Sequence, residues 1–100
     1  MADRQFLRLN DRWALAYDSL QWIIQYRMST KGKPEKWGGV SFISSNRDIL
    51  VLTLREKGIV PDPGKMEEIL ALPYTFKEWY ALRQALEDAD ARPGDVAEAA

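Results

Sequence analysis

The chain of 100 residues contains no cysteine and no histidine. Without cysteine it has no disulfide, no thiolate nucleophile and no sulfur ligand for zinc. Without histidine it lacks the usual general base near neutral pH and the commonest transition-metal ligand. The acidic residues of the C-terminal third have no obvious orienting partner in the sequence: Glu67, Glu68, Glu87, Asp88 and Asp90. We therefore expect a protein that is not an enzyme and that carries no metal or other cofactor.

Long apolar runs are also absent, since no segment approaches the roughly 20 residues that a membrane span needs. Residues 1–9 carry charges where a signal peptide would need a longer apolar segment. The pair Gly32-Lys33 lacks the spacing of a phosphate-binding loop, which argues against nucleotide hydrolysis. We expect a cytoplasmic protein without membrane contacts.

What the chain does contain is enough to build one core. Its hydrophobic fraction is 46%, and it has four Trp, four Tyr and three Phe. We expect a single compact domain over residues 1–89 and a flexible acidic tail over residues 90–100, where small and acidic residues are interrupted by Pro and Gly. Charge is uneven: residues 1–60 hold ten Lys/Arg against six Asp/Glu (+4), and residues 61–100 hold four against nine (−5).

Residues 20–28 predict the middle strand of an antiparallel sheet. Read with period two, one face carries Trp22, Ile24, Tyr26 and Met28, and the other carries Gln21, Ile23, Gln25 and Arg27. Aromatic and β-branched side chains suit a half-buried pleated surface. We expect the first of these faces to anchor the fold.

Two further strands and one weaker segment complete the predicted sheet. Residues 12–17 alternate well and lead through the turn Asp18-Ser19 into the central strand. Residues 37–44 close the sheet, with Val40 and Phe42 on the expected inner face and Gly39, Ser41 and Ile43 on the outer face. Residues 5–9 alternate only weakly, so the sheet has three strands, or four if this segment forms an edge.

Helices are predicted for the second half of the chain, packed on one face of the sheet. The segment Ser45–Asp48 resembles a capping box before a helix that ends at Gly58. Residues 65–72 form a short helix before Pro73. Thr75 and Glu78 form a second capping box, and the following helix shows an apolar stripe of Phe76, Trp79, Leu82 and Leu86. The fold class is therefore α+β.

Several stretches resemble a group of small, uncharacterised phage and prophage accessory proteins. They are residues 11–18, 21–23, 40–44 and 54–58, together with Leu72-Pro73 followed by Phe76 and Trp79. The resemblance covers most of residues 11–80 and brings no established activity with it. It implies a phage-borne setting, in which small proteins often bind and inhibit a host protein, such as a CRISPR effector in the case of anti-CRISPR proteins.

The outer face of the sheet is our candidate surface for a protein partner. By alternation it presents Gln21, Ile23, Gln25, Arg27 and Ile43 beside Ala14 and Ala16, a mixed apolar patch rimmed by Gln and Arg. An ordinary solvated sheet face explains the same pattern, and residues 1–10 folded across it would turn the patch into core.

The alternative function is a sheet-type DNA or RNA-binding module. The basic residues near one end of the sheet are Arg12, Arg27, Lys31, Lys33 and Lys36, with Trp37 adjacent. Arg and Gln read base edges, and lysines contact phosphate. The slightly negative chain and the low density of the patch favour a solubilising loop instead. The sequence leaves the oligomeric state open.

Overall fold

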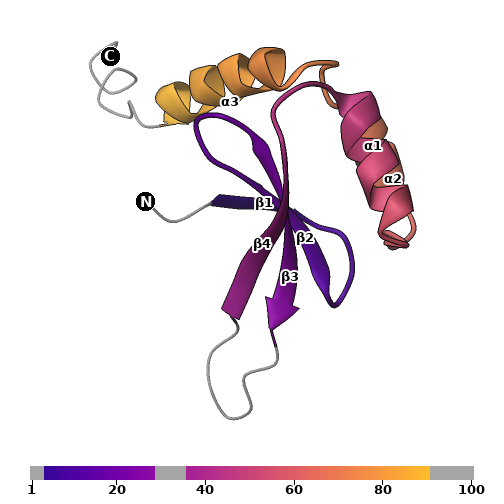
Figure 1. The fold of residues 1–100 in the computed structure, drawn as a ribbon. Coiled ribbons are helices and arrows are strands. Elements are labelled where there is room, and N and C mark those ends of the chain that lie inside the picture. Colours follow the sequence, from indigo (N-terminus) through magenta and orange to yellow (C-terminus); the bar gives the residue numbers. More distant parts are fainter. Residues whose placement is uncertain (1–3, 29–35, 91–100) are drawn as a thin grey trace.

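The computed structural model describes residues 4–28 and 36–90, which form a four-stranded antiparallel sheet followed by three helices (Figure 1). The strands are β1 (Arg4–Arg8), β2 (Trp13–Tyr17), β3 (Trp22–Met28) and β4 (Lys36–Ile43). The helices are α1 (Arg47–Glu56), α2 (Lys65–Leu70) and α3 (Phe76–Asp90). The predicted α+β fold is confirmed, and the weakly alternating segment near residue 5 is the fourth strand.

The strands lie in chain order, β1-β2-β3-β4, so that β1 and β4 form the two edges. Asn10 closes the first turn, because its Oδ1 accepts hydrogen bonds from the backbone N–H groups of Arg12 and Trp13, both at 2.9 Å. Asp18 closes the second turn in the same way, through the N–H groups of Leu20 and Gln21. Short polar side chains that bind the backbone two or three residues ahead thus set both hairpins.

The core lies between one face of the sheet and the helices, and we call this the inner face. From the sheet it takes Leu7, Leu15, Tyr17, Trp22, Ile24 and Ile43, and from the helical half Leu50, Leu54, Ile59, Ile69, Phe76 and Trp79. Trp22 is completely buried, with the Phe76 ring edge-on at 5.4 Å. The anchoring face predicted for β3 is confirmed as far as Ile24, while Tyr26 is only half-buried.

Helix α1 begins one residue later than predicted. Its N-cap is Asn46, whose Oδ1 accepts a hydrogen bond from the backbone N–H of Ile49 at 3.0 Å. Ser45 instead uses its carbonyl group, which accepts the N–H of Phe76 at the start of α3. The predicted stop is confirmed: Gly58 has a positive φ of 71°, and buried Ile59 closes the last turn.

Helix α3 starts with the predicted capping box, in which Thr75 Oγ1 accepts the N–H of Glu78 and Glu78 Oε1 accepts the N–H of Thr75. The predicted stripe is only half right. Phe76 and Trp79 are buried, whereas Leu82 and Leu86 are exposed. The buried side continues instead through Tyr80, Arg83 and Glu87, because the last two turns meet the sheet through a polar cluster. None of the helices in the described ranges could span a membrane. The tail was expected over residues 90–100; Asp90 is the last residue of α3, and residues 91–100 lie outside the described ranges.

The face assignment of the C-terminal half of β4 was wrong. Ile24 pairs with Ser41 and Gln25 pairs with Gly39, so Val40 is an extra residue in a β-bulge. A bulge shifts the alternation by one residue. Ser41 and Ile43 therefore face inward, with Ile43 opposite Trp22 in the core, whereas Phe42 lies opposite Ile23 and is exposed.

Candidate functional site

The candidate site is the face of the sheet that points away from the helices, which we call the outer face. The strand register assigns it ten side chains: Gln5, Arg8, Ala14, Ala16, Ile23, Gln25, Arg27, Trp37, Gly39 and Phe42. Its two central strands carry mostly small or uncharged side chains, and its edge strands carry the long ones. None of these ten residues is acidic.

Side chains from the edge strands close over the centre of the outer face. Gln5 Nε2 on β1 donates a hydrogen bond to Gln25 Oε1 on β3 at 3.0 Å, so the Gln5 side chain reaches across β2. The Arg8 guanidinium on β1 lies 5.0 Å from the centre of the Trp37 ring on β4. In a flat sheet these strands would be about 14 Å apart, so a contact across two strands requires a strongly coiled sheet as well as long side chains.

The Phe42 ring covers the same face from the β4 edge. A Cβ atom placed on Gly39 would lie 2.9 Å from Ile23 Cγ2 and 3.2 Å from Phe42 Cε1. The absence of a side chain at Gly39 therefore leaves room for the Phe42 ring to pack against the outer face. Phe42 nevertheless keeps 57% of its surface exposed, and its bulge neighbour Val40 keeps 44%. The apolar surface available to a partner is therefore on β4.

The predicted protein-binding residues do not form one exposed patch. Ile23 is 1% exposed and Gln25 is 6% exposed, both beneath the covering side chains. Ile43 lies on the opposite face in the core. Gln21 lies in the β2–β3 turn, where its Nε2 donates to Asp18 Oδ2. Only Arg27, opposite Trp37, lies at the accessible end of the face.

The predicted nucleic-acid-binding residues do not form one described surface either. Arg27 and Lys36 lie together at one end of the sheet, since Arg27 pairs with Trp37 and Met28 pairs with Lys36. Arg12 is at the same end, but its Nη1 donates to Tyr26 Oη, and it lines an open hollow that Asp11 and Asp62 also line. Lys31 and Lys33 fall outside the described residues.

Sequence reasoning missed Arg8, which adds a second guanidinium group to the end of the outer face that holds Arg27. Alternation within residues 5–9 would have placed Arg8 on the same side as Phe6, but β1 also carries a bulge between Gln5 and Leu7. We call Arg8, Arg27 and Trp37 the cationic end of the outer face; Lys36 pairs with Met28 and so belongs to the opposite face. In Figure 1 the ends of β3 and β4 that hold it point away from all three helices.

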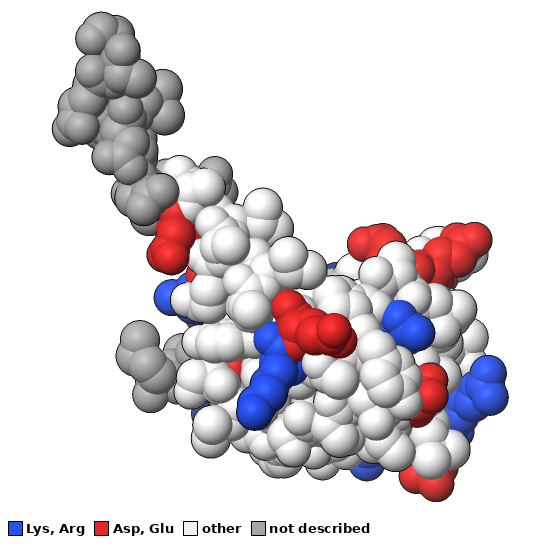
Figure 2. All heavy atoms as spheres, turned by 90° about the horizontal axis from the view of Figure 1, so that it is seen from above, with Lys and Arg blue, Asp and Glu red and all other residues white. Residues whose placement is uncertain are grey.

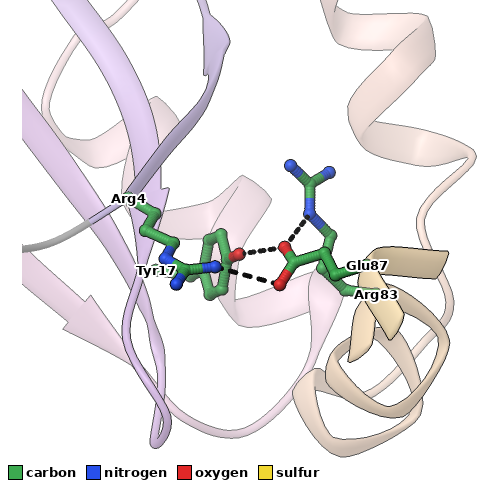
Figure 3. Close-up of polar contacts among 4 residues, drawn as sticks. All are labelled: Arg4, Tyr17, Arg83 and Glu87. Carbon is green, nitrogen blue, oxygen red and sulfur yellow. Dashed lines mark hydrogen bonds and ion pairs between the residues drawn. The ribbon is translucent and has the colours of Figure 1, made fainter. Parts of the chain in front are cut away.

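A second polar cluster lies on the inner side and joins α3 to the sheet (Figure 3). Glu87 Oε2 accepts a hydrogen bond from Tyr17 Oη at 2.6 Å and one from Arg83 Nε at 3.2 Å, while Oε1 pairs with Arg4 Nη1 at 2.9 Å. The Arg83 guanidinium lies within 5.7 Å of the ring centres of Phe6, Tyr17 and Trp79. Glu87 therefore has orienting partners that its sequence context did not reveal.

These contacts lower the pKa of Glu87 below its usual value, first through the Tyr17 hydrogen bond and then through Arg83 and Arg4, against the opposing effect of burial. A carboxylate held in its charged form by three partners is a poor general acid. The cluster's evident effect is to fix the last turns of α3 against β1 and β2.

The chemistry available to the outer face is recognition. Its ten described residues supply exposed apolar side chains, guanidinium groups and amides, and none of the ten is acidic. Elsewhere in the described part of the chain, no three acidic side chains come together as metal ligands would. No family model, no curated protein and no solved structure matches the chain.

Proposed function

We propose that the chain is a small non-enzymatic binding protein that engages another protein through the β4 side of its outer face. The observation that carries the proposal is the exposure of Phe42 on a face that no described helix covers, next to exposed Val40 and with the cationic end farther along β4. Aromatic side chains and arginine dominate the binding energy of many protein interfaces. The surface thus combines the residue types of an interface centre with a charged margin.

The resemblance described above supports the setting of this proposal. A phage or prophage accessory protein that acts by contact would bind and inhibit a host factor, for example a CRISPR effector. A chain without cysteine or histidine suits that role, because inhibition by contact needs no catalytic group.

The test is affinity capture from bacterial host lysate with the full chain as bait, with and without nuclease. Phe42→Glu should abolish capture of a specific protein, because it places a charge at the centre of the proposed interface. Leu82→Glu is the matched control, since Leu82 is also 57% exposed but lies on α3. Ile23→Glu is unsuitable, because a charge at a buried position would unfold the sheet.

Equal capture by the parent and Phe42→Glu would reject this surface. Loss of capture in both glutamate variants would point to a nonspecific effect of the added charge and would reject the surface equally. Capture that depends on nucleic acid, and is lost after nuclease treatment, would favour the alternative function.

The alternative is a nucleic-acid-binding module, which the contact of Arg8 with the Trp37 ring, opposite Arg27, favours. Single-stranded nucleic acid binds to aromatic side chains along a positively charged track. This function predicts an affinity that falls steeply as salt is added. A mobility-shift titration at low salt, with Arg27→Glu as the weakened variant, distinguishes it from the protein-binding function.

A further inference from the structure

The charge of the chain separates along its fold. Residues 22–43, which contain β3 and β4, carry four Lys/Arg against one Glu, or +3. Residues 65–90, which contain α2 and α3, carry three Lys/Arg against six Asp/Glu, or −3. On the side that looks down onto α3, acidic and basic residues are interspersed among uncharged ones (Figure 2). The positive excess therefore belongs to the hairpin that presents the proposed interface.

Charge and apolar surface occupy different parts of β4. Val40 and Phe42 form the apolar part, whereas Lys36 and Trp37 lie at the other end of the strand with Arg27 and Arg8. Phe42 is five positions after Trp37 in the chain, which corresponds to about 15 Å along a strand. A partner that uses both parts must place an apolar group and its charged groups about that far apart.

We infer that the occupant of this surface is an acidic segment of the partner protein, with one apolar side chain against Phe42 and Val40 and carboxylates against the cationic end. The inference rests on the proposed function and adds the chemistry of the partner. Carboxylates complement guanidinium and ammonium groups, and opposite charge across an interface speeds association and excludes wrong partners. A second copy of the chain would instead bring two hairpins of +3 together.

Nucleic acid would satisfy the cations but not the apolar part of the surface. Val40 offers no stacking plane, and the bulge places it next to Phe42, beyond the cationic end. An acidic protein segment with an apolar anchor accounts for both parts.

The experiment replaces Phe42 with the photo-crosslinking amino acid benzoylphenylalanine in the full chain, and replaces Leu82 in the matched control. Each protein is irradiated in host lysate, and the crosslinked peptides are identified by mass spectrometry. The expected result is a crosslink from position 42, absent from position 82, to a partner peptide rich in Asp and Glu. With the purified partner, Arg27→Glu should weaken the affinity by about twofold to tenfold, as expected for a partly exposed ion pair that is lost and reversed, whereas Lys77→Glu on α3 should not.

Each other outcome overturns the inference. A crosslink from position 42 to a neutral or basic peptide of another protein would reject the acidic partner but keep the proposed function. A crosslink to a second copy of the chain, or to nucleic acid, would replace the occupant with that molecule. Equal crosslinking from positions 42 and 82, or none from either, would reject the inference and the proposed function together.

Discussion

The two faces of the sheet exclude water by different means. The inner face carries large side chains such as Trp22 and Tyr17 and is covered by a second layer of helices. The outer face carries Ala14 and Ala16 at its centre, both fully buried although none of the described helices lies over them. Small residues on a coiled sheet, with long side chains reaching in from the edge strands, replace the second layer.

This difference shows how a chain of this size keeps a surface free for binding. Covering both faces would need a second set of helices, but side chains from β1 and β4 cover the outer face at little cost in chain length. The covering side chains, above all Arg8, Trp37 and Phe42, are then also the groups that a partner of the proposed kind would meet. The predictions below test whether the two faces behave as differently as their packing indicates.

The largest effect is expected on the inner face. Trp22→Ala removes a fully buried side chain that contacts Phe76 and Trp79, so the free energy of unfolding should fall by about 3–5 kcal/mol. Leu20→Ala, two residues earlier at a site that is 70% exposed, is the control and should change little. Urea denaturation of both variants measures the difference. If Trp22→Ala were as stable as the parent, Trp22 would not lie in the core.

A smaller loss is expected from overpacking the outer face. Gly39→Ala places a Cβ atom 2.9 Å from Ile23 Cγ2 and 3.2 Å from the Phe42 ring. This overpacking should lower the free energy of unfolding by about 1–3 kcal/mol. Gly38→Ala is the control on the inner face, where the new Cβ atom meets only the flexible end of Met28. Urea denaturation should rank Gly39→Ala as the less stable variant. The reverse order would mean that Phe42 does not pack over Gly39.

The sequence predicted the elements whose signals are local. The turns at Asn10 and Asp18, the capping box at Thr75 and the stop at Gly58 each depend on a few neighbouring residues, and all are present. Alternation likewise identified β3, because that strand has no irregularity along its buried half.

The errors have one physical origin, which is that the face of a residue depends on distant partners. The bulge at Val40 arises in the pairing of β4 with β3, and it reverses the faces of Phe42 and Ile43 without a local signal other than the preceding glycines. Leu82 and Leu86 match a helical stripe, yet the sheet meets α3 through Arg83 and Glu87. Of the predicted surface residues, Ile23, Gln25 and Arg27 therefore lie on the outer face, Ile43 lies in the core, and the exposed apolar side chain of that face is Phe42.

The Glu87 cluster should make stability depend on pH. Because its partners lower the pKa of Glu87 in the folded state, the charged form stabilises the fold above the usual carboxylate pKa, and this contribution is lost as the pH falls through the lowered value. Glu87→Gln should therefore reduce stability at neutral pH and flatten the acid limb of a plot of melting temperature against pH. Asp88→Asn removes the next carboxylate along α3 and serves as the control. If Glu87→Gln left the acid limb of this plot unchanged, ionisation of Glu87 would not contribute to the stability of the fold.

The smallest effect is expected on the exposed side of α3, where the apolar stripe predicted from sequence does not reach the core. Leu86→Gln should change the free energy of unfolding by no more than about 0.5 kcal/mol, because Leu86 is 67% exposed and glutamine is a good helix former. Trp79→Ala removes a buried side chain from the same helix and should lower the free energy of unfolding by about 3–5 kcal/mol. If the two variants lost similar stability, the helix would present Leu82 and Leu86 to a packed surface, and the Arg83–Glu87 cluster would have to lie on its solvent side. Chemical denaturation of the pair therefore decides the rotation of α3 about its own axis, and with it the choice of Leu82 as a neutral control for the outer face.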